Sequence, residues 1–211
     1  MFFTIKNSAV ATIGLLTCLV TTAAAARAML QLHWDVVPTP LRALQAAGGL
    51  AVVLFLDGLI HGGLTLTLRE RYVSRYRILA GCFRTQGARE ILVAALAAGW
   101  GEEWFFRGTL LQGLLQRSPL PPWLAVLVSG ALFGVLHRLP DPRLLPFVTW
   151  AILEGVLFGI LYIATGSLLV CMVVHGLHDL IGFAMFAAFR RWGFILPGKA
   201  PPASPPPDAS S

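Results

Sequence analysis

Charged residues are scarce in this sequence: they make up 12% of its 211 residues, whereas 56% are hydrophobic. Soluble domains carry about 25% charged and about 45–50% apolar residues. The shortage excludes a water-soluble globule of this length, because polar side chains become this sparse only where lipid replaces water around the protein. We therefore expect one helical domain within a membrane and no soluble domain.

Cysteine is scarce as well. The three cysteines, Cys18, Cys82 and Cys171, show no CxxC or CxxH spacing, which excludes a disulfide scaffold and a thiolate zinc site. Acidic residues are fewer than basic ones, and the formal net charge is +6. The basic residues lie between apolar stretches and not on one soluble face, so we expect no nucleic-acid partner. We also expect no cofactor and no bound metal.

Long apolar stretches dominate what is present. About 20 apolar residues cross the hydrocarbon core as a helix, so we predict an all-α polytopic transmembrane bundle of about six spans. The fourth stretch is short for a full crossing and can tilt or lie partly embedded. Gly62–Gly63 and the glycines from Gly155 to Gly166 predict close helix contacts. The predicted spans are Ser8–Leu30, Leu41–Leu68, Arg89–Leu115, Pro122–His137, Leu144–Ala164 and Ser167–Phe189.

Three regions follow from this pattern. Residues 1–88 hold N-terminal transmembrane helices and a basic cytoplasmic loop, residues 89–190 the core, and residues 191–211 a Pro- and Ser-rich tail predicted to be disordered. Lys6, an apolar run and Ala23–Ala26 are also typical of a cleavable signal peptide. We favour a retained helix, because the run exceeds the usual signal core of about 7–15 residues.

Basic residues set the expected orientation. The loop between the second and third stretches is rich in arginine, and the positive-inside rule places it in the cytoplasm. Alternating spans then put both termini in the cytoplasm, with Arg27, Arg42 and Arg117 outside and Arg107 within a span. The loop arginines are Arg69, Arg71, Arg75, Arg77, Arg84 and Arg89.

Ionisable residues nevertheless fall inside the apolar spans. Such residues are costly in lipid, so they normally face the bundle interior and mark a functional site. We therefore expect a site inside the bundle that is built from some of them. They are Asp57, His61, Glu102, Glu103, His137, Glu154, His175, His178 and Asp179.

Glu102 and Glu103 are expected to have different roles. On a helix, Glu103 and Arg107 are four residues apart in the favourable order for an ion pair, and such a pair can simply fix helix packing. Glu102 points about 100° away from that partner and is left free to exchange a proton. Asp57 and His61 share a helix face and can border the site or pack within the bundle. The direction in which Glu154 faces is not decided by the sequence.

Histidines supply the other candidates. Phe133 and His137 share one helix face, as do His175 and Asp179. Each set alone is also compatible with a packing role. Together, a carboxylate and two imidazoles on different helices are what hydrolysis needs, because one group takes a proton from water and others stabilise the oxyanion. His178 lies in the same turn as His175 and is a further donor.

Three motifs occur in order: EExxxR at Glu102–Arg107, FxxxH at Phe133–His137 and HxxxD at His175–Asp179. With the stretch from Gly155 to Leu168 they resemble the CAAX prenyl protease type II and bacteriocin-processing (CPBP or Abi) family. The similarity covers residues 89–179. It implies a glutamate-dependent intramembrane protease, a metal-independent peptide hydrolase whose substrate is membrane-embedded or lipid-modified.

By this resemblance, Glu102 and His137 activate water, while His175 and Asp179 hold the oxyanion. The prenyl proteases of eukaryotes and archaea have asparagine where this chain has Asp179, and asparagine is a hydrogen-bond donor that an ionised aspartate cannot replace. We hypothesise that Asp179 instead orients His175. His178 is then a candidate for the donor role. The supporting residues implied by the family are Glu103, Arg107, Phe133 and His178.

Other readings stay open. A zinc-dependent membrane protease could use His175 and His178 with Glu102, although the HExxH motif is absent. A non-catalytic membrane immunity or scaffolding protein could keep the fold and bind a peptide. The family includes proteins that process CAAX termini, mature peptides or cleave C-terminal anchors. We expect a multi-pass protein of a bacterial inner membrane, whose partners are membrane lipid and a membrane-embedded peptide or protein.

Overall fold

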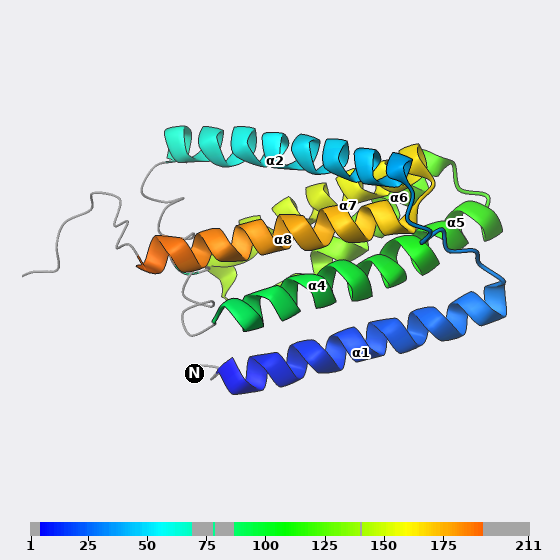
Figure 1. The fold of residues 1–211 in the computed structure, drawn as a ribbon, viewed down its shortest axis with the longest axis horizontal. Helices are drawn as coiled ribbons and strands as arrows, with labels where there is room; N and C mark the ends of the chain where they lie inside the picture. Colours follow the sequence, from blue (N-terminus) through cyan, green and yellow to red (C-terminus); the bar gives the residue numbers. More distant parts are fainter. Residues whose placement is uncertain (1–4, 69–77, 79–86, 140, 192–211) are drawn as a thin grey trace, which may run out of the picture.

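The computed structural model describes residues 5–68, 78, 87–139 and 141–191, which form helices joined by short links (Figure 1). No strand occurs in these ranges, which confirms the predicted all-α bundle. The elements are α1 (Ile5–Leu30), α2 (Pro40–Leu68), α4 (Ala88–Phe105), the π-helix η1 (Phe106–Leu111), α5 (Gln112–Arg117), α6 (Pro122–Leu136), the 3₁₀-helix η2 (Pro142–Leu144), α7 (Leu145–Thr165) and α8 (Leu168–Arg191).

Three helical segments among the described residues are long and apolar enough to cross a membrane. They are Pro40–Leu64, Pro142–Thr165 and Leu168–Ala188, and Pro122–Leu136 is a shorter apolar helix. The protein is therefore an integral membrane protein, whereas spans through α1 and through α4–α5 remain predictions, as does the orientation. The loop residues Arg69, Arg71, Arg75, Arg77 and Arg84, Cys82 and the tail from 192 onward lie outside the described residues.

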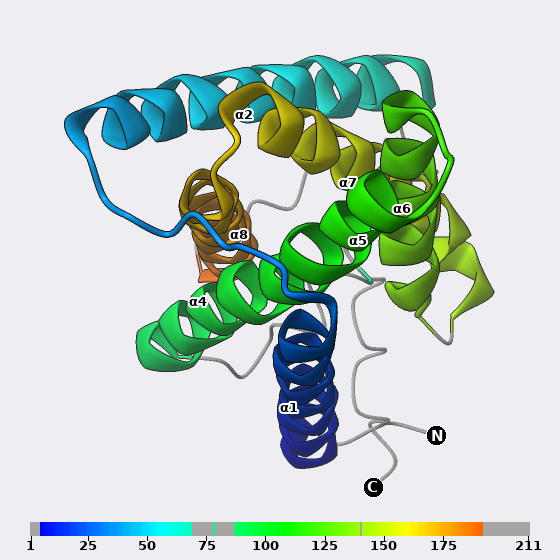
Figure 2. The same ribbon diagram turned by 90° about the vertical axis from the view of Figure 1, so that its right-hand side faces the viewer.

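Helix α8 lies at the centre of the bundle. It packs against α4, α2 and α7, while α6 packs on α7 and α1 on the outer side of α4 (Figure 2). Its first turns supply fully buried core side chains, among them Leu168, Val170, Cys171 and Val174. An apolar stripe this wide must face protein on several sides. Polar residues of α8 can therefore meet residues of three other helices.

The link between α1 and α2 closes one end of the bundle. Asp35 pairs with Arg42, and its carbonyl accepts a hydrogen bond from the Leu169 amide at the start of α8. Trp34 donates to the Gly108 carbonyl at 2.6 Å. Gly166, at φ 62°, ends α7 in the left-handed conformation that glycine adopts without strain. These contacts fix where α7 turns into α8.

Close helix contacts occur at two pairs of glycines. A Cβ atom added to Gly99 of α4 would lie 2.5 Å from the Gly176 nitrogen of α8. A Cβ atom on Gly155 of α7 would lie 2.8 Å from the Gly130 Cα of α6. The expected close contact at Gly155 is thus present. The expectation for Gly62–Gly63 was wrong for the described residues, because a Cβ atom there would meet nothing within 4 Å.

Replacing Gly99 by alanine should therefore destabilise the protein. The methyl group would meet backbone of α8, which cannot move aside like a flexible side chain, and overpacking of this kind costs about 1–3 kcal/mol. Gly58→Ala on α2 is the matched control, because a Cβ atom there meets nothing within 4 Å. Unfolding free energies in detergent would measure both variants. Equal stability of the two would contradict the close α4–α8 approach.

Candidate active site

The two adjacent glutamates lie where α4 changes into a π-helix. Residues Phe106–Leu111 form this wider turn, and the Thr109 hydroxyl donates to the Trp104 carbonyl five residues earlier at 3.0 Å. Single π-turns inside helices are rare and occur frequently at functional sites. No sequence pattern indicated this one. It follows directly after Glu102 and Glu103 and contains Arg107.

Glu103 and Arg107 form the predicted ion pair. The guanidinium Nη1 lies 2.7 Å from Glu103 Oε1, and both side chains are completely buried. Nη2 of Arg107 donates to the Gly155 carbonyl of α7 at 2.7 Å. The guanidinium also lies over the Phe133 and Phe158 rings, at 4.8 and 5.3 Å from their centroids. The pair therefore joins α4 and η1 to α6 and α7.

Glu103 also orients His175. Its Oε1 atom lies 2.8 Å from His175 Nδ1, and because a carboxylate accepts, Nδ1 is the nitrogen that donates. Asp179 approaches the other nitrogen, Nε2, at 3.6 Å, which is beyond hydrogen-bond length. Asp179 thus contacts His175 as an ion pair and not through a hydrogen bond, and its role in orienting His175 stays a prediction. Stacking of the His175 ring on Phe158, with centroids 4.8 Å apart, fixes its plane further.

Glu102 is left to face the imidazole nitrogens. Its Oε2 atom lies 3.5 Å from His137 Nε2 and 3.9 Å from His175 Nε2. His137 Nδ1 lies 2.8 Å from the Phe133 carbonyl, to which it must donate. Nε2 of a neutral His137 therefore presents its lone pair towards Glu102. The side chains of Glu102 and His137 are 15% and 28% exposed, whereas that of Glu103 is completely buried.

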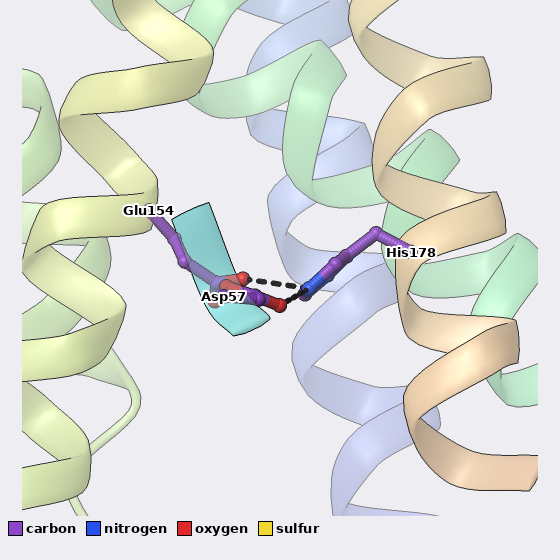
Figure 3. A group of neighbouring side chains, drawn as sticks. All are labelled: Asp57, Glu154 and His178. Carbon is purple, nitrogen blue, oxygen red and sulfur yellow. Dashed lines mark hydrogen bonds and ion pairs between the residues drawn. The ribbon is translucent and has the colours of Figure 1, made fainter. Parts of the chain in front are cut away.

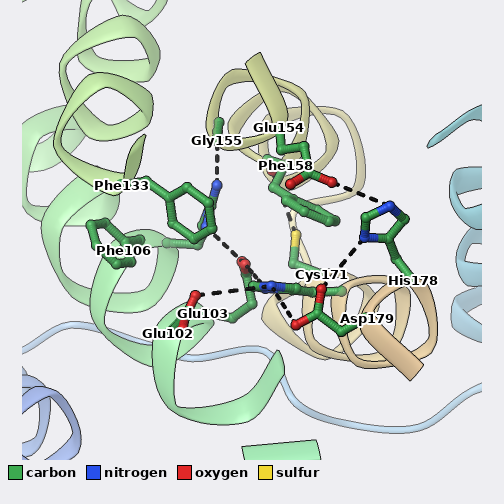
Figure 4. A network of polar contacts seen from close by, with 12 residues as sticks. Glu102, Glu103, Phe106, Phe133, Glu154, Gly155, Phe158, Cys171, His178 and Asp179 are labelled. Carbon is green, nitrogen blue, oxygen red and sulfur yellow. Dashed lines mark hydrogen bonds and ion pairs between the residues drawn. The ribbon is translucent and has the colours of Figure 1, made fainter. Parts of the chain in front are cut away.

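The predicted catalytic residues Glu102, His137, His175 and Asp179 thus come from α4, the end of α6 and α8, and meet in one place. Figure 4 shows the carboxylates of Glu102, Glu103 and Asp179 directed into the same space between the helices. The arrangement combines a proton acceptor with imidazoles of defined tautomer. It can remove a proton from a bound water and stabilise negative charge nearby.

His178 is not a member of this group. Its Nε2 atom lies 2.5 Å from Asp57 Oδ2 of α2 and 3.2 Å from Glu154 Oε1 of α7. His175, His178 and Glu102 do not form a group with ligand atoms close enough to hold one metal ion in the part of the chain that the structure describes. Asp57 thus contacts His178 and not the residues around Glu102. His61 lies against Trp150, with ring centroids 5.2 Å apart.

Two contributions to the site were missed by sequence reasoning. They are the Gly155 carbonyl, which accepts from Arg107, and the Phe158 ring, which lies on His175. Both fall in the stretch between the FxxxH and HxxxD motifs. The close approach of α6 and α7 at Gly155 brings them to the site. Gly155, for which the sequence predicted a close helix contact, was the signal that could have indicated them.

Comparison with known proteins agrees with the resemblance drawn from the motifs. Residues 85–181 match the family model described as type II CAAX prenyl endopeptidase Rce1-like. The match covers less than half of the chain, so it is a similarity of this segment to the family. The segment contains all three motifs and the residues that meet around Glu102, which confirms the resemblance drawn from the motifs.

Part of the chain is also similar to a curated protein. The uncharacterised protein YyaK of Bacillus subtilis (strain 168) is 38% identical over 85 residues, which cover 37% of this chain and 27% of that protein. The chain therefore spans about a quarter of the length of this relative. No solved structure matches the chain significantly.

Proposed function

We propose that this protein is an intramembrane endopeptidase that hydrolyses a peptide bond of a membrane-embedded or lipid-modified substrate with water activated by Glu102 and His137. The observation that carries the proposal is the difference between the contacts of Glu102 and those of Glu103. Glu103 Oε1 pairs with both Arg107 and His175, whereas Glu102 has no arginine partner and its Oε2 atom faces His137 Nε2 and His175 Nε2 without a hydrogen bond in the described structure.

The proposed reaction uses these contacts in sequence. Glu102, assisted by His137 Nε2, removes a proton from water while the oxygen attacks the substrate carbonyl carbon. The resulting oxyanion accepts a hydrogen bond from Nε2 of a doubly protonated His175, whose Nδ1 donates to Glu103 and holds the ring in place. When the C–N bond breaks, the proton taken from water passes to the leaving amine. The products are a carboxylic acid, which retains the second proton of the water until it ionises, and an amine, and Glu102 returns to its starting state.

The location of the site supports a substrate in the bilayer. The catalytic candidates lie on helices with long apolar faces, and many apolar side chains there are exposed, for example Leu132, Val135 and Ile160. Such a surface contacts lipid, so a peptide bond reaches Glu102 from within the membrane or from its interface. CAAX-type processing, peptide maturation and cleavage of C-terminal anchors all fit this geometry.

The test compares protein termini in membranes of the native host that carries wild type or Glu102→Gln. Uncleaved C-termini or precursor peptides that accumulate with the variant would establish proteolysis and name the substrate together. Glu90→Gln is the matched control, because Glu90 lies on the same helix and is exposed. Identical termini in all three strains at equal expression would overturn the proposal and favour a non-catalytic membrane protein.

A substitution series at Asp179 tests the oxyanion role that the resemblance implies, for which the carboxyl group must be protonated because an ionised aspartate cannot donate. Asp179→Asn should keep activity near wild type, because asparagine can donate to the oxyanion and the orientation of His175 depends on Glu103. Asp179→Ala should lower kcat by about 10²–10³-fold, the cost of one oxyanion donor. Cleavage of the identified substrate measures both variants. Loss of activity in Asp179→Asn would instead require a carboxylate at this position.

A further inference from the structure

A second polar cluster lies beside the candidate active site, at the meeting point of three helices. Asp57 of α2, Glu154 of α7 and His178 of α8 point towards one another (Figure 3). One oxygen of each carboxylate and one ring nitrogen of His178 lie within 4.8 Å of one another. The three side chains are 15%, 13% and 11% exposed. The proposed peptidase chemistry uses none of them.

Hydrogen bonding alone leaves this cluster incomplete. His178 Nε2 can carry a single proton, yet it faces both Asp57 Oδ2 at 2.5 Å and Glu154 Oε1 at 3.2 Å. In the described structure Asp57 Oδ1, Glu154 Oε1 and His178 Nδ1 are buried atoms without any hydrogen bond. Buried polar atoms are nearly always paired, so each exception calls for an explanation.

The charges of these side chains also indicate that the cluster is incomplete. Two carboxylates face one imidazole in a region poor in water, and an imidazolium balances only one of them. An uncompensated buried carboxylate is strongly unfavourable. A divalent cation bound to both carboxylates and to the neutral Nε2 atom would balance the charge and use all three facing lone pairs.

The surroundings of His178 match this chemistry. A histidine that binds a metal usually donates its other ring N–H to a carboxylate or carbonyl, which fixes its tautomer. His178 Nδ1 faces Asp179 Oδ1 at 3.6 Å, within a small shift of a hydrogen bond. One imidazole and two carboxylates form a ligand set for divalent transition metals, whereas Mg²⁺ and Ca²⁺ prefer ligand sets made of oxygen alone.

From these contacts we propose that Asp57, Glu154 and His178 bind a divalent transition-metal ion of the Zn²⁺ or Mn²⁺ class. The site departs from the expectation of no bound metal. It is separate from the peptidase proposal, because Glu102 and His137 are not among its ligands. The ion joins α2 to α7 and α8, and through His178 it holds Asp179 at the edge of the active site.

The experiment uses the full chain in detergent, stripped of metal and titrated with Zn²⁺ against a chromophoric chelator. Wild type should bind about one Zn²⁺ more per chain than Asp57→Asn or His178→Gln, because each variant removes a ligand while keeping side-chain size. Zn²⁺ should also raise the thermal midpoint of wild type and leave that of the two variants unchanged. Asp179→Ala should weaken Zn²⁺ binding by about 10-fold or more as a loss of support to a ligand.

Matched controls separate this proposal from the peptidase proposal. Asp141→Asn removes an exposed loop carboxylate, and Glu102→Gln removes the candidate base, so both should bind Zn²⁺ like wild type. Circular dichroism in the absence of metal should show the same helix content in all variants. Equal Zn²⁺ binding by Asp57→Asn and wild type would overturn the site. Loss of binding in Glu102→Gln alone would overturn it too and would favour a zinc-dependent protease.

Discussion

Glu102→Gln is expected to lower kcat for the identified substrate by about 10²–10⁴-fold, the contribution typical of a positioned general base. The amide has nearly the shape of the carboxylate but cannot take a proton from water. Because Glu102 makes no ion pair with Arg107 and its Oε2 atom has no hydrogen bond in the described structure, thermal stability should stay close to wild type. Purified protein in proteoliposomes, assayed under single-turnover conditions, gives the rate directly.

Two comparisons make this result specific. Glu90→Gln changes an exposed glutamate of the same helix and should keep the wild-type rate. Glu103→Gln should lower both the rate and the thermal midpoint, because it weakens the contacts to Arg107 and His175 together. A Glu102→Gln enzyme with full activity would remove Glu102 from the mechanism and leave the histidines as the remaining candidates for the base.

Arg107→Leu is expected to destabilise the protein by about 3–5 kcal/mol, the usual cost of removing one partner from a buried ion pair. Arg107 is completely buried, and its loss leaves the Glu103 carboxylate with His175 as its remaining partner in the described structure. It also leaves the Gly155 carbonyl without the Arg107 hydrogen bond. Equilibrium unfolding in mixed detergent micelles, followed by tryptophan fluorescence, measures the change.

An exposed ion pair supplies the control. Arg143 is 68% exposed and donates to Asp141, and these hydrogen bonds lower the pKa of the Asp141 carboxyl. Arg143→Leu should leave stability unchanged within error, because surface pairs contribute little. The double variant Glu103→Gln with Arg107→Leu should recover part of the loss, since it leaves no unpaired buried charge. Equal effects of Arg107→Leu and Arg143→Leu would show that Arg107 is not held as described.

Local sequence properties were enough to predict the helices of this protein and the contacts within each helix. The helical stretches follow from apolar length, and their predicted bounds agree with α1, α2, α6, α7 and α8 to within a few residues. The ion pair of Glu103 with Arg107 follows from four-residue helical spacing. The shared face of His175 and Asp179 follows from the same rule. These features depend on residues close together in the chain, where helix geometry fixes the distances.

The sequence by itself therefore determined the helices, their membrane character, the Glu103–Arg107 pair and the set of polar residues from which a site could be built. Only the tertiary structure decided which of these residues meet. Spacing along one helix placed Asp179 beside His175, and only the packing of α4 on α8 adds Glu103 as the hydrogen-bond partner of His175. His178 likewise faces Asp57, 121 residues away along the chain. Contacts between helices depend on how closely their backbones approach at Gly99 and Gly155, and a glycine in the sequence does not determine which helix it will meet.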